Sequence, residues 1–144
     1  MKYRNIPLAS FIAALLLAIY FFYFKWSYSR FNSIDFESSV FYGDKYIFSP
    51  SDDEYLIFIY SSKTIDFLET TKLFDKYGLK VIAIDLYQNT KLKISNNIIP
   101  LSASINTLLN LIHVFNIREV PVSFKIKRKN GSLFIQNSSQ YLYK

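Results

Sequence analysis

Residues 55–86 read YLIFIYSSKTIDFLETTKLFDKYGLKVIAIDL, and this stretch decides the fold. It opens with an apolar run at 55–60 and closes with a second apolar run at 79–86. Short runs rich in β-branched and aromatic residues are typical of strands buried on both faces. Between them, residues 64–77 have the apolar spacing of a helix, and Gly78 follows where helices commonly end. The stretch therefore predicts a strand, a helix and a second strand parallel to the first.

The segment after this unit predicts a second helix. A looser stretch at 87–101 precedes residues 102–115, whose apolar side chains recur at i, i+3, i+4 and i+7. The residues predicted to form the buried stripe are Ile105, Leu108, Leu109 and Ile112.

Two short strands are predicted near the C-terminus, at 122–126 and 132–135. The turn between them contains Asn130-Gly131, a strong hairpin signal that makes this pair antiparallel. The predicted order is β-α-β-α-β-β, which is an α/β fold.

The composition divides the chain into four parts. Residues 1–30 form the N-terminal region, and 31–54 form a juxtamembrane linker that ends in a polar, turn-rich run. Residues 55–136 form the folded domain, and 137–144 form a short C-terminal tail.

The N-terminal region contains a candidate membrane anchor. Residues 6–24, IPLASFIAALLLAIYFFYF, carry no charge, and at about 1.5 Å per residue their helix matches a bilayer core of ~30 Å. Tyr20, Tyr23 and Trp26 gather at the far end, as aromatic side chains do at membrane interfaces. A cleaved signal peptide and a buried soluble helix are the alternatives. We expect an uncleaved anchor, because bulky aromatics stand where small residues should precede a cleavage site.

The basic residues that flank this segment are nearly balanced, with Lys2 and Arg4 before it and Lys25 and Arg30 after it. A basic N-terminus usually keeps to the cytoplasmic side. We therefore expect a single-pass protein of the inner (cytoplasmic) membrane whose C-terminal domain lies in the periplasm.

Charge and composition exclude several classes of function. The net charge is +6, but residues 31–144 hold thirteen basic and eleven acidic residues, so no nucleic-acid partner is expected. The chain has no cysteine, so its own thiols carry no chemistry. With one histidine and no cysteine, no metal site is expected, and no cofactor motif occurs.

These elements, together with particular residues, resemble the thioredoxin-like fold. Residues 55–86 are similar to that family's first core strand, active-site turn, long helix and following strand. Residues 115–131, FNIREVPVSFKIKRKNG, resemble its approach to a substrate-binding proline, the next strand and a hairpin. The most specific element is Val120-Pro121, because the family's proline is cis and abuts the active-site turn. The phrase KYGLKVIAIDL, at 76–86, is similar to one in membrane-anchored thioredoxin-like proteins of conjugative transfer and type IV secretion.

The resemblance departs from the family at the residues that carry its chemistry. A Cys-x-x-Cys motif should open the long helix, but Lys63-Thr64-Ile65-Asp66 aligns there. The resemblance therefore implies a redox-inactive protein and not an enzyme. It also implies that the family's groove remains and binds an extended polypeptide, with backbone pairing at Val120. The residues expected to line this groove are Ser62, Lys63, Thr64, Asp66, Val120 and Pro121.

The expected function is binding and assembly in an envelope protein complex, with a secretion or conjugation machine as the specific expectation. An accessory structural subunit of another membrane complex and a membrane-tethered chaperone are the alternatives. An enzyme that uses glutathione as cosubstrate would need Ser61 or Ser62 to activate the bound thiol, and no general base is evident nearby. The oligomeric state is left open.

Three further features have an ordinary structural interpretation beside a functional one. His113 lies between two apolar residues of the second predicted helix, where a structural or exposed role is expected. Asp52-Asp53-Glu54 is expected to be a solvated turn, with loose cation binding as the alternative. The basic hairpin, which comprises Lys125, Lys127, Arg128 and Lys129, is expected to be solvated, with an anionic partner or lipid headgroups as the alternative.

Overall fold

A computed structural model describes residues 6–63, 72, 74–90 and 96–143, and the chain divides into two compact units, Met1–Asn32 and Ser33–Lys144. The first unit contains the helix α1, Ile6–Phe31. Its segment Pro7–Phe24 has a mean hydropathy of 2.1 and no buried residue, and it is long and apolar enough to span a membrane. Because its apolar side chains point outward all around the axis, this helix has no single buried face of the kind that a soluble domain provides.

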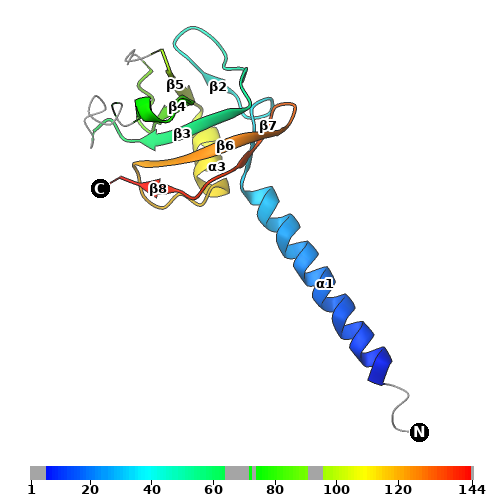
Figure 1. The fold of residues 1–144 in the computed structure, drawn as a ribbon. Coiled ribbons are helices and arrows are strands. Elements are labelled where there is room, and N and C mark those ends of the chain that lie inside the picture. Colours follow the sequence, from blue (N-terminus) through cyan, green and yellow to red (C-terminus); the bar gives the residue numbers. More distant parts are fainter. Residues whose placement is uncertain (1–5, 64–71, 73, 91–95, 144) are drawn as a thin grey trace. The chain divides into compact units, whose positions relative to one another are not determined.

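The second unit is built on a mixed sheet, drawn in Figure 1. The strand order among the described residues is β1-β7-β6-β3-β4-β5-β2, and β8 also pairs with β6. The strands are β1 (Ser33–Asp35), β2 (Phe41–Tyr42), β3 (Glu54–Tyr60), β4 (Lys80–Asp85), β5 (Ile98–Ala103), β6 (Val122–Asn130), β7 (Leu133–Gln136) and β8 (Tyr141–Leu142).

The centre of the sheet follows the sequence prediction. β3 is parallel to β4, and β6 and β7 form an antiparallel hairpin, so both predicted pairings are confirmed. The hairpin turns at Gly131, whose φ of +50° is a conformation that glycine adopts without steric cost. On its other side, β6 is antiparallel to β3, which makes β3 the central strand of the sheet.

The edge strand β5 is a difference from the sequence prediction. The interpretation of 87–101 as loose missed it, and residues 102 and 103, expected to begin a helix, belong to this strand. β5 runs parallel to β4, and β2 covers its outer edge at Ser102 and Ala103. The strand contains Pro100, which lacks an N–H and is a residue that edge strands tolerate.

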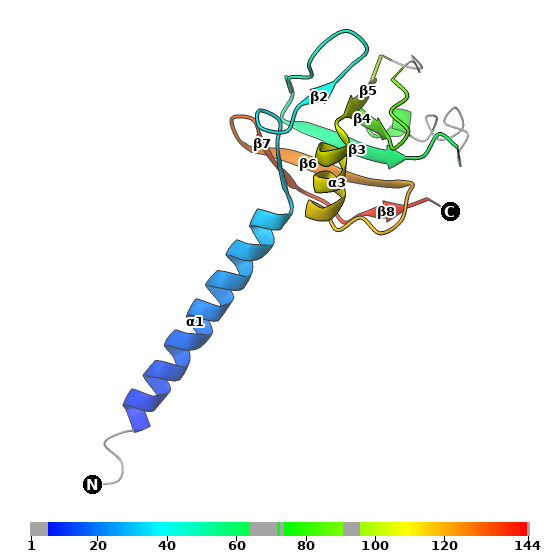
Figure 2. The ribbon, with the colours of Figure 1, turned by 180° about the vertical axis from the view of Figure 1, so that it is seen from behind.

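One face of the sheet is covered by the helix α3, Ile105–Val114, which lies behind the sheet in Figure 1 and in front of it in Figure 2. The helix begins three residues later than predicted, because Ser104 is its N-cap and accepts from the Thr107 amide at 3.2 Å. Leu108 and Leu111 are buried.

The predicted stripe on this helix was partly wrong. Ile105 is 68% exposed and Leu109 is 58% exposed, whereas Phe115, which follows the helix, is buried. The buried positions are 108, 111 and 115. They follow the same helical period as the predicted stripe, but the face that they form is rotated around the helix axis.

Residues 33–54, most of the segment interpreted as a linker, belong to the second, folded unit. β1 pairs with β7, β2 pairs with β5, and four buried side chains of 31–54 join the core beneath α3. These four are Ile34, Phe36, Phe41 and Phe48. The tail at 137–144 also differs from its interpretation, since β8 pairs with the start of β6.

The opposite face of the sheet carries a second, smaller apolar cluster. Leu56, Phe58 and Tyr60 of β3 form its centre. Phe74 packs on Phe58 with ring centroids 4.8 Å apart. Phe74 belongs to the short 3-10 helix η1, Phe74–Lys76, near the end of the predicted helix at 64–77. Most of that predicted helix lies outside the described residues.

Candidate functional site

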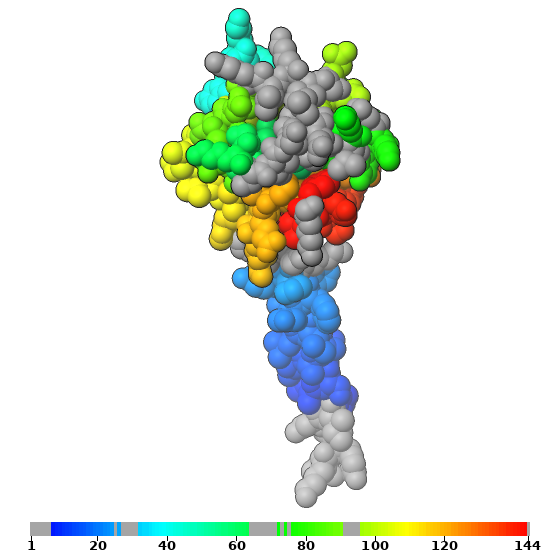
Figure 3. Space-filling model, turned by 90° about the vertical axis from the view of Figure 1, so that its left-hand side faces the viewer, coloured from blue at the N-terminus to red at the C-terminus, as the bar shows by residue number. Residues whose placement is uncertain are grey.

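The candidate site lies at the end of the sheet where β3 and β4 finish and β6 begins. Val122, the first residue of β6, pairs with Ile59 near the end of β3. The Val120-Pro121 pair therefore emerges beside the turn that holds Ser61 and Ser62. The carboxyl ends of parallel strands are a common place for binding sites, because loops from different strands converge there. Figure 3 faces this end of the second unit.

Asp85 connects the two turns at this end of the sheet. It is the last residue of β4 and is 1% exposed. One carboxylate oxygen accepts from the amides of Ser62 and Tyr87, both at 3.0 Å, and the other accepts from the Asn89 amide at 3.3 Å. A buried carboxylate with several amide donors fixes backbone geometry strongly. Asp85 thus holds the turn after β3 against the turn after β4.

The exposed rim of the site contains a cation–π pair. The Lys63 ammonium lies 4.2 Å from the centroid of the Tyr87 ring, and both side chains are exposed. Gln88 follows with a φ of +60°, and its side-chain amide donates to the carbonyl of Ala103 at 3.1 Å. The rim therefore offers one cation and one aromatic face to a ligand, held by a turn tied to the end of β5.

The Val120-Pro121 peptide bond is cis. Val120 is partly buried and packs against the main core. Among the described residues, no hydrogen bond involves the backbone of Val120, whereas the carbonyl of Pro121 accepts from the Tyr143 amide at 3.1 Å.

Tyr60 lies beneath the site and is fully buried. Burial, and to a lesser extent the nearby Asp85 carboxylate, raises the pKa of Tyr60 well above its ordinary value near 10. Its hydroxyl stays protonated at any physiological pH. Its ring stacks on Phe58, with centroids 5.2 Å apart.

The structure places four of the six predicted site residues at this end of the sheet. Ser62, Lys63, Val120 and Pro121 lie there, whereas Thr64 and Asp66 lie outside the described residues. Sequence reasoning missed Asp85, Tyr87 and Tyr143. The sequence did carry a signal for Asp85, because it is an acidic residue inside the apolar run at 79–86.

Comparison of the chain with protein-family models, curated proteins and solved structures gave no match.

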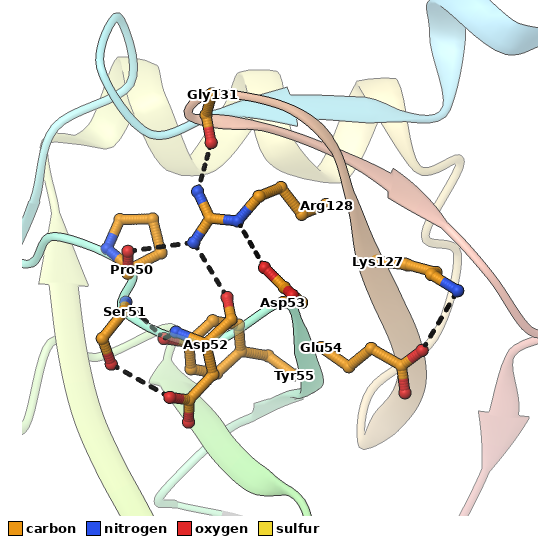
Figure 4. Close-up of polar contacts among 9 residues, drawn as sticks. All are labelled: Pro50, Ser51, Asp52, Asp53, Glu54, Tyr55, Lys127, Arg128 and Gly131. Carbon is orange, nitrogen blue, oxygen red and sulfur yellow. Dashed lines mark hydrogen bonds and ion pairs between the residues drawn. The ribbon is translucent and has the colours of Figure 1, made fainter.

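The acidic turn at 52–54 is neutralised by basic side chains, as Figure 4 shows for Asp53 and Glu54. The ion pairs are Lys80–Asp52 at 2.8 Å, Arg128–Asp53 at 2.9 Å and Lys127–Glu54 at 3.6 Å. The hydrogen bond from Lys80 holds the pKa of Asp52 below its usual value. Within the described ranges, no three acidic or histidine side chains come together in a way that could hold a metal ion.

Arg128, at the centre of Figure 4, joins the basic hairpin to the chain before β3. Its guanidinium donates to Asp53, to the carbonyls of Pro50 and Asp52 at 3.1 and 3.0 Å, and to the carbonyl of Gly131. Its guanidinium carbon lies 4.9 Å from the centroid of the Phe134 ring. Arg128 and Lys127 are therefore engaged within the domain, which favours a structural role for the basic hairpin over an anion site.

The structure also gives the surroundings of two other residues that the sequence singled out. His113 is exposed on α3, and Ser61, the serine weighed for activating a bound thiol, is buried with 7% exposure.

Proposed function

We propose that the protein is a redox-inactive, membrane-anchored binding and assembly protein with a thioredoxin-like domain. The carrying observation is that Val120-Pro121, just before β6, and the Ser62-Lys63 turn, just after β3, lie at the same end of the sheet. This is where the family resemblance implies a peptide groove. The central β4-β3-β6-β7 order, with β3 and β4 parallel and β6 and β7 antiparallel, also supports the resemblance.

The peptide groove that the resemblance implies at this end of the sheet suits an extended polypeptide better than a small molecule. Its partly buried wall offers the Val120 backbone, which a strand added beside it would pair with. Its rim offers the Lys63 ammonium and the Tyr87 ring, which together suit an acidic or aromatic side chain. The core packing of Val120 and the Asp85 bonds hold these groups in place without a partner.

The cellular setting proposed is the cell envelope. The helix α1 would anchor the chain in the inner membrane, and the Ser33–Lys144 unit would face the periplasm as part of a secretion or conjugation machine. The alternative of an accessory structural subunit makes the anchor the binding element. A membrane-tethered chaperone would use the same groove with little selectivity.

The test is co-purification of tagged full-length protein from detergent-solubilised membranes, with mass spectrometry of the proteins recovered. We expect a defined set of envelope proteins. Lys63→Trp should reduce their recovery at least about tenfold by filling the groove. Lys129→Trp, at the exposed hairpin tip, is the matched control and should leave recovery unchanged.

Other outcomes of this experiment distinguish the alternatives. Equal recovery with Lys63→Trp would refute the groove. Loss of binding after exchange of residues 6–24 for an unrelated anchor would favour the accessory subunit. A broad mixture of unfolded secreted chains, released by competing peptide, would indicate the chaperone.

A further inference from the structure

The C-terminal segment of the chain lies along the edge of β6 that faces away from β3. β8 pairs with Val122 and Ser123 in antiparallel register. Beyond it, the amide of Tyr143 donates to the carbonyl of Pro121 at 3.1 Å. In Figure 3 the C-terminal residues, in red, lie at the surface beside the start of β6, in orange. A strand of this chain thus already occupies a backbone edge next to the candidate site.

The side chain of Tyr143 enters a defined socket, formed by Phe58, Phe74 and Ser123. Its hydroxyl lies 2.8 Å from the hydroxyl of Ser123. Its ring packs edge-on against Phe58, with centroids 5.7 Å apart, and against Phe74, with centroids 6.1 Å apart. Burial raises the pKa of Tyr143 above its ordinary value, so the hydroxyl keeps its proton. The socket accepts one aromatic side chain with a polar tip.

The rest of the segment is held by few contacts: the side-chain amide of Gln140 donates to the carbonyl of Phe115, and β8 adds one short pairing. β8 has two residues, and Tyr141 and Leu142 are 63% and 45% exposed, whereas Phe134 of β7 is fully buried. Between the two strands the ladder is partly interrupted, because the amide of Lys125 donates to the side chain of Ser138, although the carbonyl of Lys125 still accepts from the Asn137 amide at 2.8 Å. Short, exposed strand pairings open at low free-energy cost.

We propose that the β6 edge at Pro121–Ser123, with the Tyr143 socket, is a strand-docking site that β8 occupies until a partner displaces it. The partner is an extended segment with two aromatic residues spaced as in Tyr141-Leu142-Tyr143, because alternate residues of a strand share one face. Docking exchanges one antiparallel strand for another and places the incoming aromatic ring in the socket. The idea rests on the proposed function only in requiring an extended partner segment.

A partner segment must displace β8 before it can bind to the β6 edge. β8 is joined to β7 through residues 137–140, so its effective concentration at the edge is high, on the order of millimolar. A partner segment must outcompete it, which selects for partners that also contact the Lys63 rim or reach high local concentration in the membrane.

The test uses the full chain and a chain shortened to end at Ser139, both in detergent micelles. The probe is the peptide SSQYLYK, residues 138–144, labelled at its N-terminus and followed by fluorescence anisotropy. We expect the shortened chain to bind it at least about tenfold more tightly than the full chain does. The control peptide SSQYLAK, which lacks the socket tyrosine, should bind at least about tenfold more weakly.

Equal affinity for the two chains would overturn the proposal. So would the absence of binding by a shortened chain whose β6 and β7 amides remain protected from hydrogen exchange. If the shortened chain does not fold, excess peptide is added to the full chain. Faster hydrogen exchange of the amides at 141–143, with the exchange of the β7 amides unchanged, then supports displacement. Unchanged hydrogen exchange at 141–143 refutes it. Lys63→Trp leaves the β6 edge intact, so failure of the groove and failure of this site are separable.

Discussion

Single side chains tie together parts of the second unit that are distant in sequence. Asp85 joins the turn after β3 to the turn after β4 through backbone amides. Arg128 joins the hairpin to the segment before β3. Tyr143 joins the chain end to β3 and β6. Each of these contacts involves a polar atom of the side chain or a partly buried ring. A substitution at one of these positions therefore removes identified hydrogen bonds or ring contacts.

Arg128→Lys should destabilise the domain by about 2 kcal/mol, because one ammonium cannot replace a guanidinium that serves four acceptors. The side chain is 25% exposed, so solvent replaces these bonds only in part. Urea unfolding of the detergent-solubilised protein measures the change. Lys129→Gln, at the exposed tip of the same hairpin, should stay within about 0.5 kcal/mol of wild type. A similar loss in both variants would contradict the role given to Arg128.

The raised pKa of Tyr60 makes the stability of the domain fall at alkaline pH. This pKa is raised in the folded state, so the unfolded chain loses its proton first as pH rises. The stability from the neutral hydroxyl is fully present below about pH 10 and is lost progressively above it. Tyr60→Phe should make this decline shallower in unfolding curves taken from pH 8 to about 11. Tyr46→Phe, at an exposed ring, should leave it unchanged, and an unaltered slope in Tyr60→Phe would contradict the assignment.

The regular elements differ in how far the sequence alone predicts them. β3, β4 and the β6–β7 hairpin follow from apolar runs and from Asn130-Gly131, which are local signals. β1, β2 and β8 have two or three residues each and form because a distant strand pairs with them. β5 contains Pro100 and follows a polar stretch, so only its pairing with β4 reveals it.

The candidate site, too, is predicted from the sequence only in part. The sequence placed Ser62, Lys63, Val120 and Pro121 together through a family resemblance. It gave no reason to involve Tyr143, because that contact depends on a C-terminal strand held by long-range pairing.

The start of α3 is stabilised by a side-chain cap. Ser104 caps the helix through its bond from the Thr107 amide. Ser104→Ala should lower the free energy of unfolding by about 1 kcal/mol, and Ser104→Asp, which keeps an acceptor, should restore most of it. Thermal or urea unfolding followed by circular dichroism measures both variants. Equal stability of the alanine and aspartate variants would show that the cap contributes nothing.

At the scale of the whole molecule, the chain combines an apolar helix with a folded unit that has its own core. The topology of this arrangement is testable with single introduced cysteines, since the chain has none. Ser139→Cys and Lys129→Cys place a thiol on exposed positions of the second unit.

We expect both thiols to react in intact cells with a maleimide that crosses the outer but not the inner membrane. Lys2→Cys, which precedes α1, should react only after the inner membrane is broken. The reverse pattern would place the Ser33–Lys144 unit in the cytoplasm. Failure to recover Lys2→Cys in the mature chain would instead indicate cleavage of the N-terminal segment.

Pro100 has a consequence for self-association. A bare sheet edge can pair with the same edge of another copy, which invites open-ended, edge-to-edge polymerisation. β2 shields the last two residues of β5, and Pro100 presents no N–H on the stretch before them. This border of the sheet is therefore a poor template for another copy. Self-propagating filaments are therefore disfavoured at this border.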